Sequence, residues 1–167
     1  MNASQTPIFA GISPQDYALL QPMTHQKDYA RGQIILHAGN LAPQVGLVLT
    51  GRVHIEMSDP WGGRGILGSV GPGEIFAESY ALCAQPLQVD AVCAEDARIL
   101  LLDADRALRA VPRLCQNLLS ICARKNLALS RRIFCTSAPT VRARVITYLS
   151  TAGRQGDDLV LPFNRQQ

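Results

Sequence analysis

The chain has 167 residues, of which 47% are apolar and 17% are charged. This length and composition suit one domain with a packed core and part of a second, and they argue against a disordered protein. No apolar run approaches the roughly 20 residues that a membrane-spanning helix needs, and the first residues lack the regions of a signal peptide. We therefore expect a cytoplasmic protein with no membrane partner.

Charge is distributed unevenly along the chain. Residues 1–97 carry four basic and nine acidic side chains, whereas residues 98–167 carry twelve basic and four acidic ones. A basic second half is typical of a protein that meets a polyanion. The alternative is an Arg-rich helix surface that is only solvated.

Strand patterns dominate the first hundred residues, after a short helix at Pro14–Leu20. Apolar and other residues alternate with period two over 45–50 and 53–57, which is the pattern of a half-buried strand. Further strands are expected at Gln33–Leu36, Ile66–Val70, Val89–Ala94 and Arg98–Asp103. Gly-rich turns separate them, and Gly62–Gly65 is expected to be a hairpin turn. Many short strands with such turns favour a sandwich or a jelly roll.

A helical pattern begins near Asp105 and continues to Cys135, where Pro112 marks a first turn or a break between two helices. Apolar residues recur there in steps of four and three, which makes a heptad seam with an Asn inside it. The seam consists of Cys115, Leu119, Cys122, Asn126, Leu129 and Ile133. A second stripe lies on an adjacent face, at Leu114, Leu118, Ile121 and Ala128.

A helix with two apolar stripes can bury one on its own domain and the other on a partner helix. We therefore expect a homodimer through this helix, with Asn126 fixing a parallel register and Cys122 facing its copy. The competing interpretation is that one monomer buries both stripes. Beyond the helix, residues 136–139 read as a hinge, Thr140–Ala152 as another helix and Leu159–Leu161 as a short strand, with Asn164 capping a further helix.

The order of these pieces resembles that of Crp/Fnr-type transcription regulators. The stretches that carry the resemblance are PIFAGISPQD, YARGQIILHAGN, VGLVLTGRVHIEM, GSVGPGEIFAES, RILLLD, RKNLALSRRI and TVRARVITYL. LPFNRQQ resembles the entry to the family's winged helix-turn-helix. As an ordered set they cover nearly the whole chain, although each glycine turn alone would be a weak signal.

The resemblance implies a mainly β plus α fold. It consists of a double-stranded β-helix (jelly roll), a cyclic-nucleotide-binding-like sensor domain over 1–104, a dimerisation helix over 105–136, and the start of a winged helix-turn-helix over 137–167. The helix that enters the major groove in such readers is expected beyond Gln167. The implied partners are DNA, a second copy and a small effector, with Arg142, Arg144 and Arg165 as candidates for DNA-backbone contacts.

In relatives that bind cyclic AMP, the loop after the Gly-Pro-Gly-Glu turn carries a Glu for the ribose hydroxyl and, further on, an Arg and a Ser for the cyclic phosphate. An ungapped count places Glu78 at the Glu, but Gln88 and Val89 at the Arg and Ser. Ala77 stands where a Gly is usual. The helical Thr-Ser pair that meets the adenine corresponds to Leu127 and Ala128.

The charges of this segment agree with that departure. No basic residue lies between Arg64 and Arg98, while Glu74, Glu78, Asp90, Glu95 and Asp96 are all acidic. A buried phosphate normally needs charge-assisted contacts to offset its desolvation. We therefore expect an effector other than cyclic AMP, one that is less anionic or takes its countercharge from Arg124.

The candidate residues of the effector pocket are therefore drawn from the loop and the long helix. They are Glu78, Ser79, Tyr80, Gln88, Val89, Arg124, Leu127 and Ala128. The alternative is a vestigial pocket, in which Glu78 and Ser79 only cap a short helix.

No cofactor is expected. The five cysteines are odd in number and form no CxxC pair, which is typical of reduced thiols. Cys83 and Cys93 could sense redox state or bind a soft metal, but two buried small apolar residues are the favoured interpretation. An iron–sulfur cluster would need N-terminal cysteines, and the first here is Cys83.

Enzyme signatures are also lacking. The histidines, His25, His37 and His54, show no HxH or HExxH spacing, so a cupin-like metalloenzyme stays only an alternative. Haem bound through His54 is a second alternative, against a surface-facing strand histidine. The sequence contains neither GxxxxGK[ST] nor GxSxG. We expect a non-enzymatic regulator, with a sensor module that lacks DNA function as a third alternative.

Overall fold

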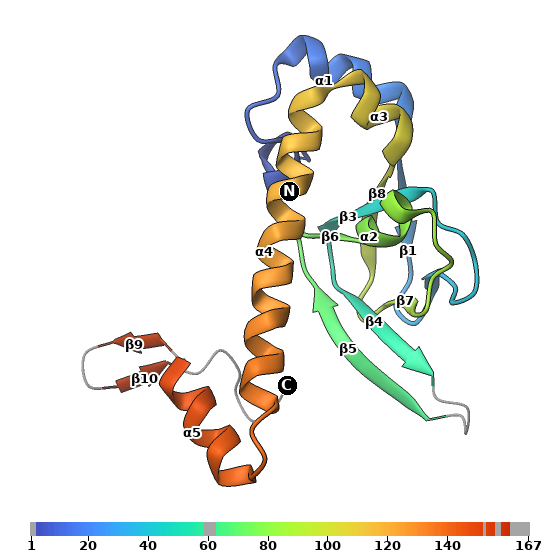
Figure 1. The fold of residues 1–167 in the computed structure, drawn as a ribbon. Coiled ribbons are helices and arrows are strands. Elements are labelled where there is room, and N and C mark those ends of the chain that lie inside the picture. The colour runs from blue at the N-terminus through green and yellow to red at the C-terminus, as the bar shows by residue number, and fades with distance from the viewer. Residues whose placement is uncertain (1–2, 59–62, 152, 156–157, 161–167) are drawn as a thin grey trace. The chain divides into compact units, whose positions relative to one another are not determined.

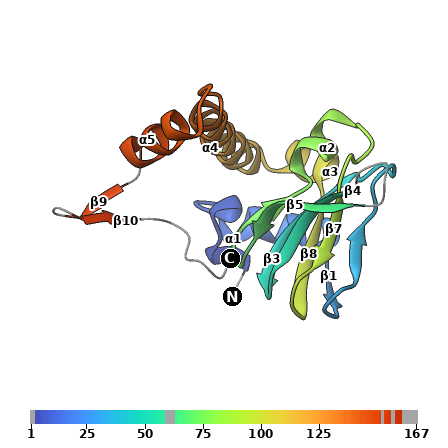
Figure 2. The same cartoon turned by 90° about the horizontal axis from the view of Figure 1, so that it is seen from below.

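The computed structural model describes residues 3–58, 63–151, 153–155 and 158–160. The chain forms two compact units, Met1–Cys122 and Ala123–Gln167, and the long helix α4 contributes to both. The first unit contains the β-rich part, and Figures 1 and 2 show its strands in two views.

The first unit is built on two four-stranded antiparallel sheets. One sheet has the order β1-β8-β3-β6, with β1 Thr24–Tyr29, β8 Ala97–Asp103, β3 Gln44–Thr50 and β6 Ile75–Phe76. The other has the order β2-β7-β4-β5, with β2 Ile34–Leu36, β7 Asp90–Cys93, β4 Val53–Ser58 and β5 Arg64–Val70. Apart from the hairpin of β4 and β5, neighbouring strands come from distant parts of the sequence. This arrangement confirms the predicted jelly roll.

Strands β3 and β8 are buried on both faces and separate two hydrophobic cores. The first core joins their residues Leu47 and Leu100 to the helices and to Leu114 of α4. The second core lies toward the other sheet and contains Val48, Ile99 and other residues. The sequence pattern predicts a half-buried strand over 45–50, which is wrong for β3, because Leu47 and Leu49 face the first core while Val48 faces the second.

Helices cover the first core. They are α1 Pro14–Leu20, α2 Glu78–Cys83, α3 Ala104–Ala110 and α4 Pro112–Thr136, with short 3-10 turns at Ala3–Gln5, Pro7–Phe9 and Gln21–Met23. Ser13 caps α1 by accepting a hydrogen bond from Asp16 N, and Asp103 caps α3 by accepting one from Arg106 N. The break between α3 and α4 falls at Val111, so Pro112 occupies the predicted first-turn position.

The second unit contains the remainder of α4, helix α5 Val141–Thr151, and the antiparallel strands β9 Gly153–Gln155 and β10 Asp158–Val160. Thr140 caps α5, because its Oγ1 accepts a hydrogen bond from Ala143 N at 3.1 Å. Leu161 and Asn164, and with them the stretch LPFNRQQ that resembles the family's entry to the helix-turn-helix, lie outside the described residues.

Some sequence expectations need correction. The sequence pattern does not predict strand β1, because its residues are mostly polar and exposed. The predicted hairpin is confirmed, because β4 and β5 pair antiparallel, but Arg64 and Gly65 belong to β5 and pair with Ser58 and Met57. The predicted helical region from Asp105 consists of two helices, which confirms the predicted break at Pro112. None of the helices in the described part of the chain is both long and apolar enough to cross a membrane.

Candidate effector-binding site

The loop that leads to the candidate site is anchored on β3. Gly73 N donates to Val48 O at 2.8 Å, and Val48 N donates to Glu74 O at 3.0 Å. The Glu74 carboxylate closes the turn by accepting from Gly71 N at 2.7 Å. Gly73 has a φ of +85°, a conformation that suits glycine. The turn therefore fixes the positions of β6 and α2 relative to β3.

The residues immediately before and after helix α2 both have a left-handed backbone conformation. Ala77 before it has φ 62° and Ala84 after it has φ 51°. A left-handed alanine costs roughly 1–2 kcal/mol because its Cβ crowds the backbone. Only the surrounding contacts can hold two such residues within one short loop, so this loop stores backbone strain.

Glu78 is the first residue of α2, and its side chain is only 6% exposed. The two candidates that follow it lie nearer the surface, since Ser79 is exposed and Tyr80 is half-buried. Ala77, and not a side-chain oxygen, stands at the N-cap, where no side-chain hydrogen bond is formed. The loop therefore brings one carboxylate into the protein, as the match with the family's Glu implies.

Gln88 and Val89 stand where relatives that bind cyclic AMP have their phosphate-binding Arg and Ser. The buried side chains around these positions are apolar. Leu87 and Val89 are buried, whereas Gln88 between them is exposed. Backbone hydrogen bonds hold the segment against 39–40, from Gly39 N to Leu87 O at 2.7 Å and from Leu87 N to Asn40 O at 2.9 Å. The buried side chains of this segment thus carry no positive charge.

Two arginines close to these strands are paired with carboxylates at the surface. Arg98 forms two hydrogen bonds with Asp28, and this guanidinium lowers the pKa of the Asp28 carboxyl. Arg52 lies 3.6 Å from the Glu95 carboxylate. Both pairs are exposed, so each guanidinium is held outside the roll.

The other pocket candidates belong to the second unit. Arg124, Leu127 and Ala128 lie on α4 after Cys122, and all three are exposed, Leu127 to 70%. Their participation in an effector pocket stays a prediction.

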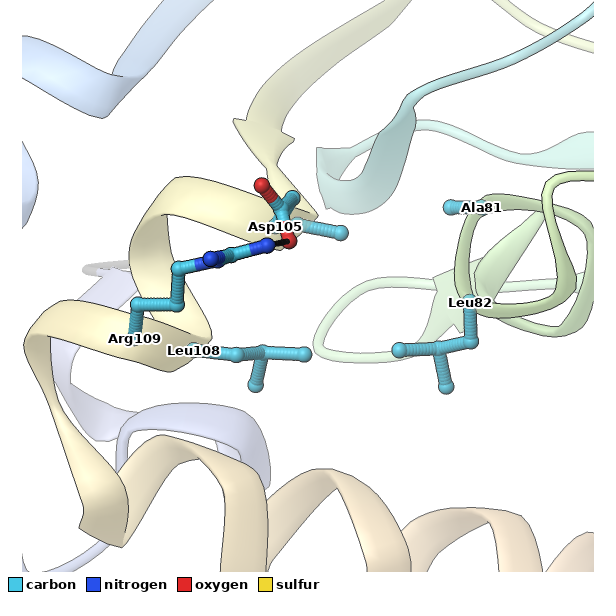
Figure 3. A pocket seen from close by; sticks show the side chains of 6 residues that line it. Ala81, Leu82, Asp105, Leu108 and Arg109 are labelled. Atoms are coloured by element: carbon cyan, nitrogen blue, oxygen red, sulfur yellow. Dashed lines mark hydrogen bonds and ion pairs between the residues drawn. The ribbon is translucent and has the colours of Figure 1, made fainter.

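A shallow pocket of about 210 Å³ lies between α2 and α3, and sequence reasoning missed it. Figure 3 shows Leu82 and Leu108 pointing toward each other across it, with the ion pair of Asp105 and Arg109 beside them. Its lining consists of Ala81, Leu82, Ala104, Asp105, Leu108 and Arg109. No sequence pattern reveals such a space, because it depends on how two short helices meet.

The thiols and the histidine have different surroundings. Cys93 is buried in the second core, and burial raises the pKa of its thiol. Cys83 is exposed, so the expectation of two buried cysteines is right for Cys93 and wrong for Cys83. His54 is half-buried on β4, opposite Val92 of β7. Among the described residues, no three His, Cys, Asp or Glu side chains gather as a metal site would require.

The two stripes of α4 have different environments. Leu114 and Leu118 of the second stripe are buried in the first core, and Ile121 packs against it, whereas Ala128 is exposed. The seam residues are mostly exposed, with Leu119 at 70%, Leu129 at 55% and Ile133 at 56%. Cys115 and Asn126 are exposed as well, while Cys122 is half-buried and packs against the first core.

Of the candidates for DNA contacts, Arg142 and Arg144 are exposed on α5. Arg165 lies outside the described residues.

Comparison with known proteins places these features in a family. The model of the cyclic nucleotide-binding domain matches residues 26–113. The chain is 29% identical over 154 residues to the cyclic AMP receptor protein of Thermus thermophilus, a match that covers 90% of this chain and 71% of that protein. It is 27% identical over 122 residues to the CRP-like cAMP-activated global transcriptional regulator of Mycobacterium tuberculosis, covering 71% of this chain and 54% of that protein.

Solved structures agree with this fold. The catabolite activator protein of Thermus thermophilus matches with a TM-score of 0.69 at 27% identity, over 79% of this chain and 63% of that one. The sensor domain of the transcriptional regulator DNR from Pseudomonas aeruginosa has a TM-score of 0.65 at 19% identity, over 83% and 93% of the two chains, and shows the fold alone. A cAMP-binding acyltransferase of Mycobacterium smegmatis also matches, with a TM-score of 0.64 at 25% identity over 75% and 40%.

The left-handed conformation of Ala77 allows a test of whether the loop before α2 stores backbone strain. Ala77→Gly should raise the free energy of unfolding by about 0.5–1 kcal/mol, because relief of strain exceeds the added entropy of the unfolded chain. Ala81→Gly, in the middle of α2, should lower it by about 0.5–1 kcal/mol, since there the backbone is helical. Urea denaturation of both variants measures the difference. Equal destabilisation by both would show that Ala77 is not held in a left-handed conformation.

Proposed function

Because the chain belongs to the cyclic nucleotide-binding domain family and, within it, to the Crp/Fnr regulators, we propose that it is the sensor and dimerisation part of a DNA-binding transcription regulator. A small effector bound at the loop of Glu78 changes the geometry of α4. The dimer of α4 helices then repositions the DNA-binding regions. In this proposal the sensor occupies 1–104, the dimerisation helix 105–136, and the start of the DNA-binding domain 137–167.

The single observation that carries the proposal is that α4 has two apolar faces, one buried against the roll and one exposed. Leu114 and Leu118 attach it to the sensor, while Leu119, Leu129 and Ile133 form an exposed apolar seam along it. Burying each leucine or isoleucine stabilises a complex by roughly 1.5–3 kcal/mol, which over two copies can exceed the cost of association. A second copy of the same helix offers the matching surface.

Asn126 supports a parallel pairing. It lies in the seam with apolar residues before and after it, and its amide can pair with the same amide of a second copy across a twofold axis. An antiparallel pair would instead place each Asn126 against apolar side chains and leave its amide unsatisfied.

DNA is the proposed partner of the second unit. Residues 123–167 carry eight basic and two acidic side chains. Arg142 and Arg144 are exposed on the first helix after α4, where they can reach phosphates. The wing and the recognition helix are expected in residues after those that the structure describes, and sequence-specific contacts are assigned to them.

The effector is proposed to differ from cyclic AMP. The inward-facing residues Leu87 and Val89 carry no charge, so this segment offers no positive charge to a cyclic phosphate, whereas Glu78 matches the Glu that meets the ribose hydroxyl in relatives. These observations support a ligand that is less anionic than a cyclic phosphate and can donate hydrogen bonds to a carboxylate. The chain spans 54–71% of the two curated relatives, so the activity of the whole protein belongs to the proposal.

The competing functions have less support. A cupin-like metalloenzyme needs a cluster of His and Glu, and the described part of the chain holds no such group. The solved structure of the cAMP-binding acyltransferase shows that this fold also occurs within an enzyme. A sensor module with a vestigial pocket remains the second candidate, because the exposed Gln88 and buried Val89 fit a roll that has lost its ligand.

Cyclic AMP should bind this chain weakly. Loss of a buried charge-assisted hydrogen bond costs about 2–5 kcal/mol, or well over tenfold in affinity, so calorimetry should detect no binding at micromolar concentrations. The double variant Gln88→Arg, Val89→Ser restores the chemistry of the family's motif and should strengthen binding by at least about tenfold. Micromolar or tighter binding by the unmodified chain would contradict this view of the loop.

The dimer should depend on the exposed seam. Leu119→Asp places a carboxylate in that seam and should convert a micromolar dimer into a monomer, because two unpaired charges would be buried together. Ser120→Asp adds the same charge one residue further along the helix and should leave the dimer intact. Sedimentation velocity at micromolar concentration measures both. An unmodified chain that is monomeric there would end the dimer-helix interpretation.

Binding of this chain to duplex DNA should be independent of sequence and strongly weakened by salt. Replacing Arg142 and Arg144 with Gln should reduce the slope of log affinity against log salt by about 0.9 for each phosphate that the protein no longer neutralises. Arg106→Gln with Arg109→Gln removes the same charge from α3 of the first unit and should leave the slope unchanged. Fluorescence anisotropy over a salt series gives these slopes. A footprint on one defined sequence at physiological salt would refute sequence-independent binding.

A further inference from the structure

The N-terminal segment Ala3–Ile12, which we call the strap, lies against the first turns of α4 (Figure 1). Asn117 of α4 donates both amide hydrogens to it, to Ile8 O at 3.0 Å and to Ala10 O at 2.8 Å. Neither the predicted dimer seam nor the candidate effector site includes Asn117 or the strap.

Apolar contacts accompany these hydrogen bonds. Ile8 and Phe9 of the strap are buried in the same first core as Leu114 and Leu118 of α4. Phe9 also contacts Tyr17 of α1 edge-on, with ring centroids 5.4 Å apart. The strap is therefore part of the packed sensor unit and not a loose terminus.

The strap passes closely over α4 at Gly11. This residue has φ +68°, and a Cβ added there would lie 3.2 Å from Nη2 of Arg113. Arg113 in turn donates to Gln116 at 3.1 Å. Both the conformation and the close approach favour glycine at this position, so the path of the strap is tied to the same helical turns as Asn117.

Helical geometry shows what these contacts fix. With 100° between successive residues, Asn117 lies on one flank of the buried stripe of Leu114 and Leu118, and the seam residue Leu119 lies on the other. Apolar burial depends little on direction, whereas a hydrogen bond requires alignment. The stripe attaches α4 to the roll, and the two hydrogen bonds of Asn117 select one rotation of the helix about its axis.

We infer that Asn117 is a positioning residue, which clips the strap to α4 and thereby sets the rotation at which the helix presents its seam to a second copy. This inference rests on the proposed function, because it assigns a consequence to the orientation of the dimer helix. The sensor unit thus contributes its own N-terminus to the alignment of the dimer.

The test is a cross-linking comparison of two helix faces, in a background where Cys83, Cys115 and Cys122 are serine. Leu119→Cys reports on the seam, and Ser120→Cys reports on a face turned away from it. In the dimer, a copper–phenanthroline oxidant should join the first pair of copies much faster than the second. The ratio of the two rates measures the rotation of α4.

Asn117→Asp replaces the donating amide with a carboxylate that faces two carbonyl oxygens. It should lower the ratio roughly tenfold, as expected from the net contribution of two hydrogen bonds. Gln116→Glu makes the same chemical change one residue away, on an exposed side chain that can still accept from Arg113, and should leave the ratio unchanged. Measurements are made at a temperature where circular dichroism shows each variant to be folded.

The outcomes are distinct. A dimer in which Asn117→Asp lowers only the melting temperature and keeps the ratio overturns the positioning role alone. If that variant does not fold, Asn117→Gln, which moves both donors outward by one methylene, serves in its place and should lower the ratio by a smaller factor, with an unchanged ratio overturning the role. An unmodified chain that is monomeric, or cross-links equally at both positions, overturns the proposed dimer and the positioning role with it.

Discussion

The attachment of α4 to the sensor depends on the burial of Leu114 and Leu118 in the first core. A helix has only a limited circumference, and these two residues occupy the part that meets the roll. The flank beside them holds Asn117 and the strap, and the opposite flank carries the exposed seam. Because the buried stripe and the seam lie on one rigid helix, a change in how α4 meets the roll also changes the direction in which the seam points. This constraint makes α4 suitable for transmitting a signal.

Electrostatics limits what the roll can receive. Arg52 and Arg98 are paired with carboxylates at the surface, and the loop places the carboxylate of Glu78 inside. An anion entering there would lose its hydration, which is unfavourable unless a positive charge accompanies it. The relatives whose names include cyclic AMP share the fold of this chain, and a ligand other than cyclic AMP is our proposal for the present loop.

The jelly roll, the buried stripe of α4 and the position of Pro112 could be predicted, because short strands with Gly-rich turns and apolar residues at helical spacing leave repeating patterns in the sequence. Strand β1 could not, since His25, Gln26 and Lys27 expose polar side chains and its place is decided by pairing with β8. The contacts of Asn117 with the strap also could not be predicted from a sequence pattern, because its partners are backbone carbonyls 109 and 107 residues away. Within the candidate site, the family's motif identified Glu78. The buried and exposed alternation of Leu87, Gln88 and Val89 had to come from the structure.

The pairing of β1 with β8 has a consequence for how the sensor is made. Thr24 lies opposite Leu102, and Tyr29 opposite Ala97. Strand β1 therefore cannot pair until β8, one of the last strands of the roll, has been synthesised. Contacts between such distant residues form slowly, because a long loop must close before they stabilise anything. The strap closes later still, when residue 117 has been synthesised. A nascent chain thus completes the first core only after the first turns of α4 have been synthesised, because Leu114 and Leu118 belong to that core.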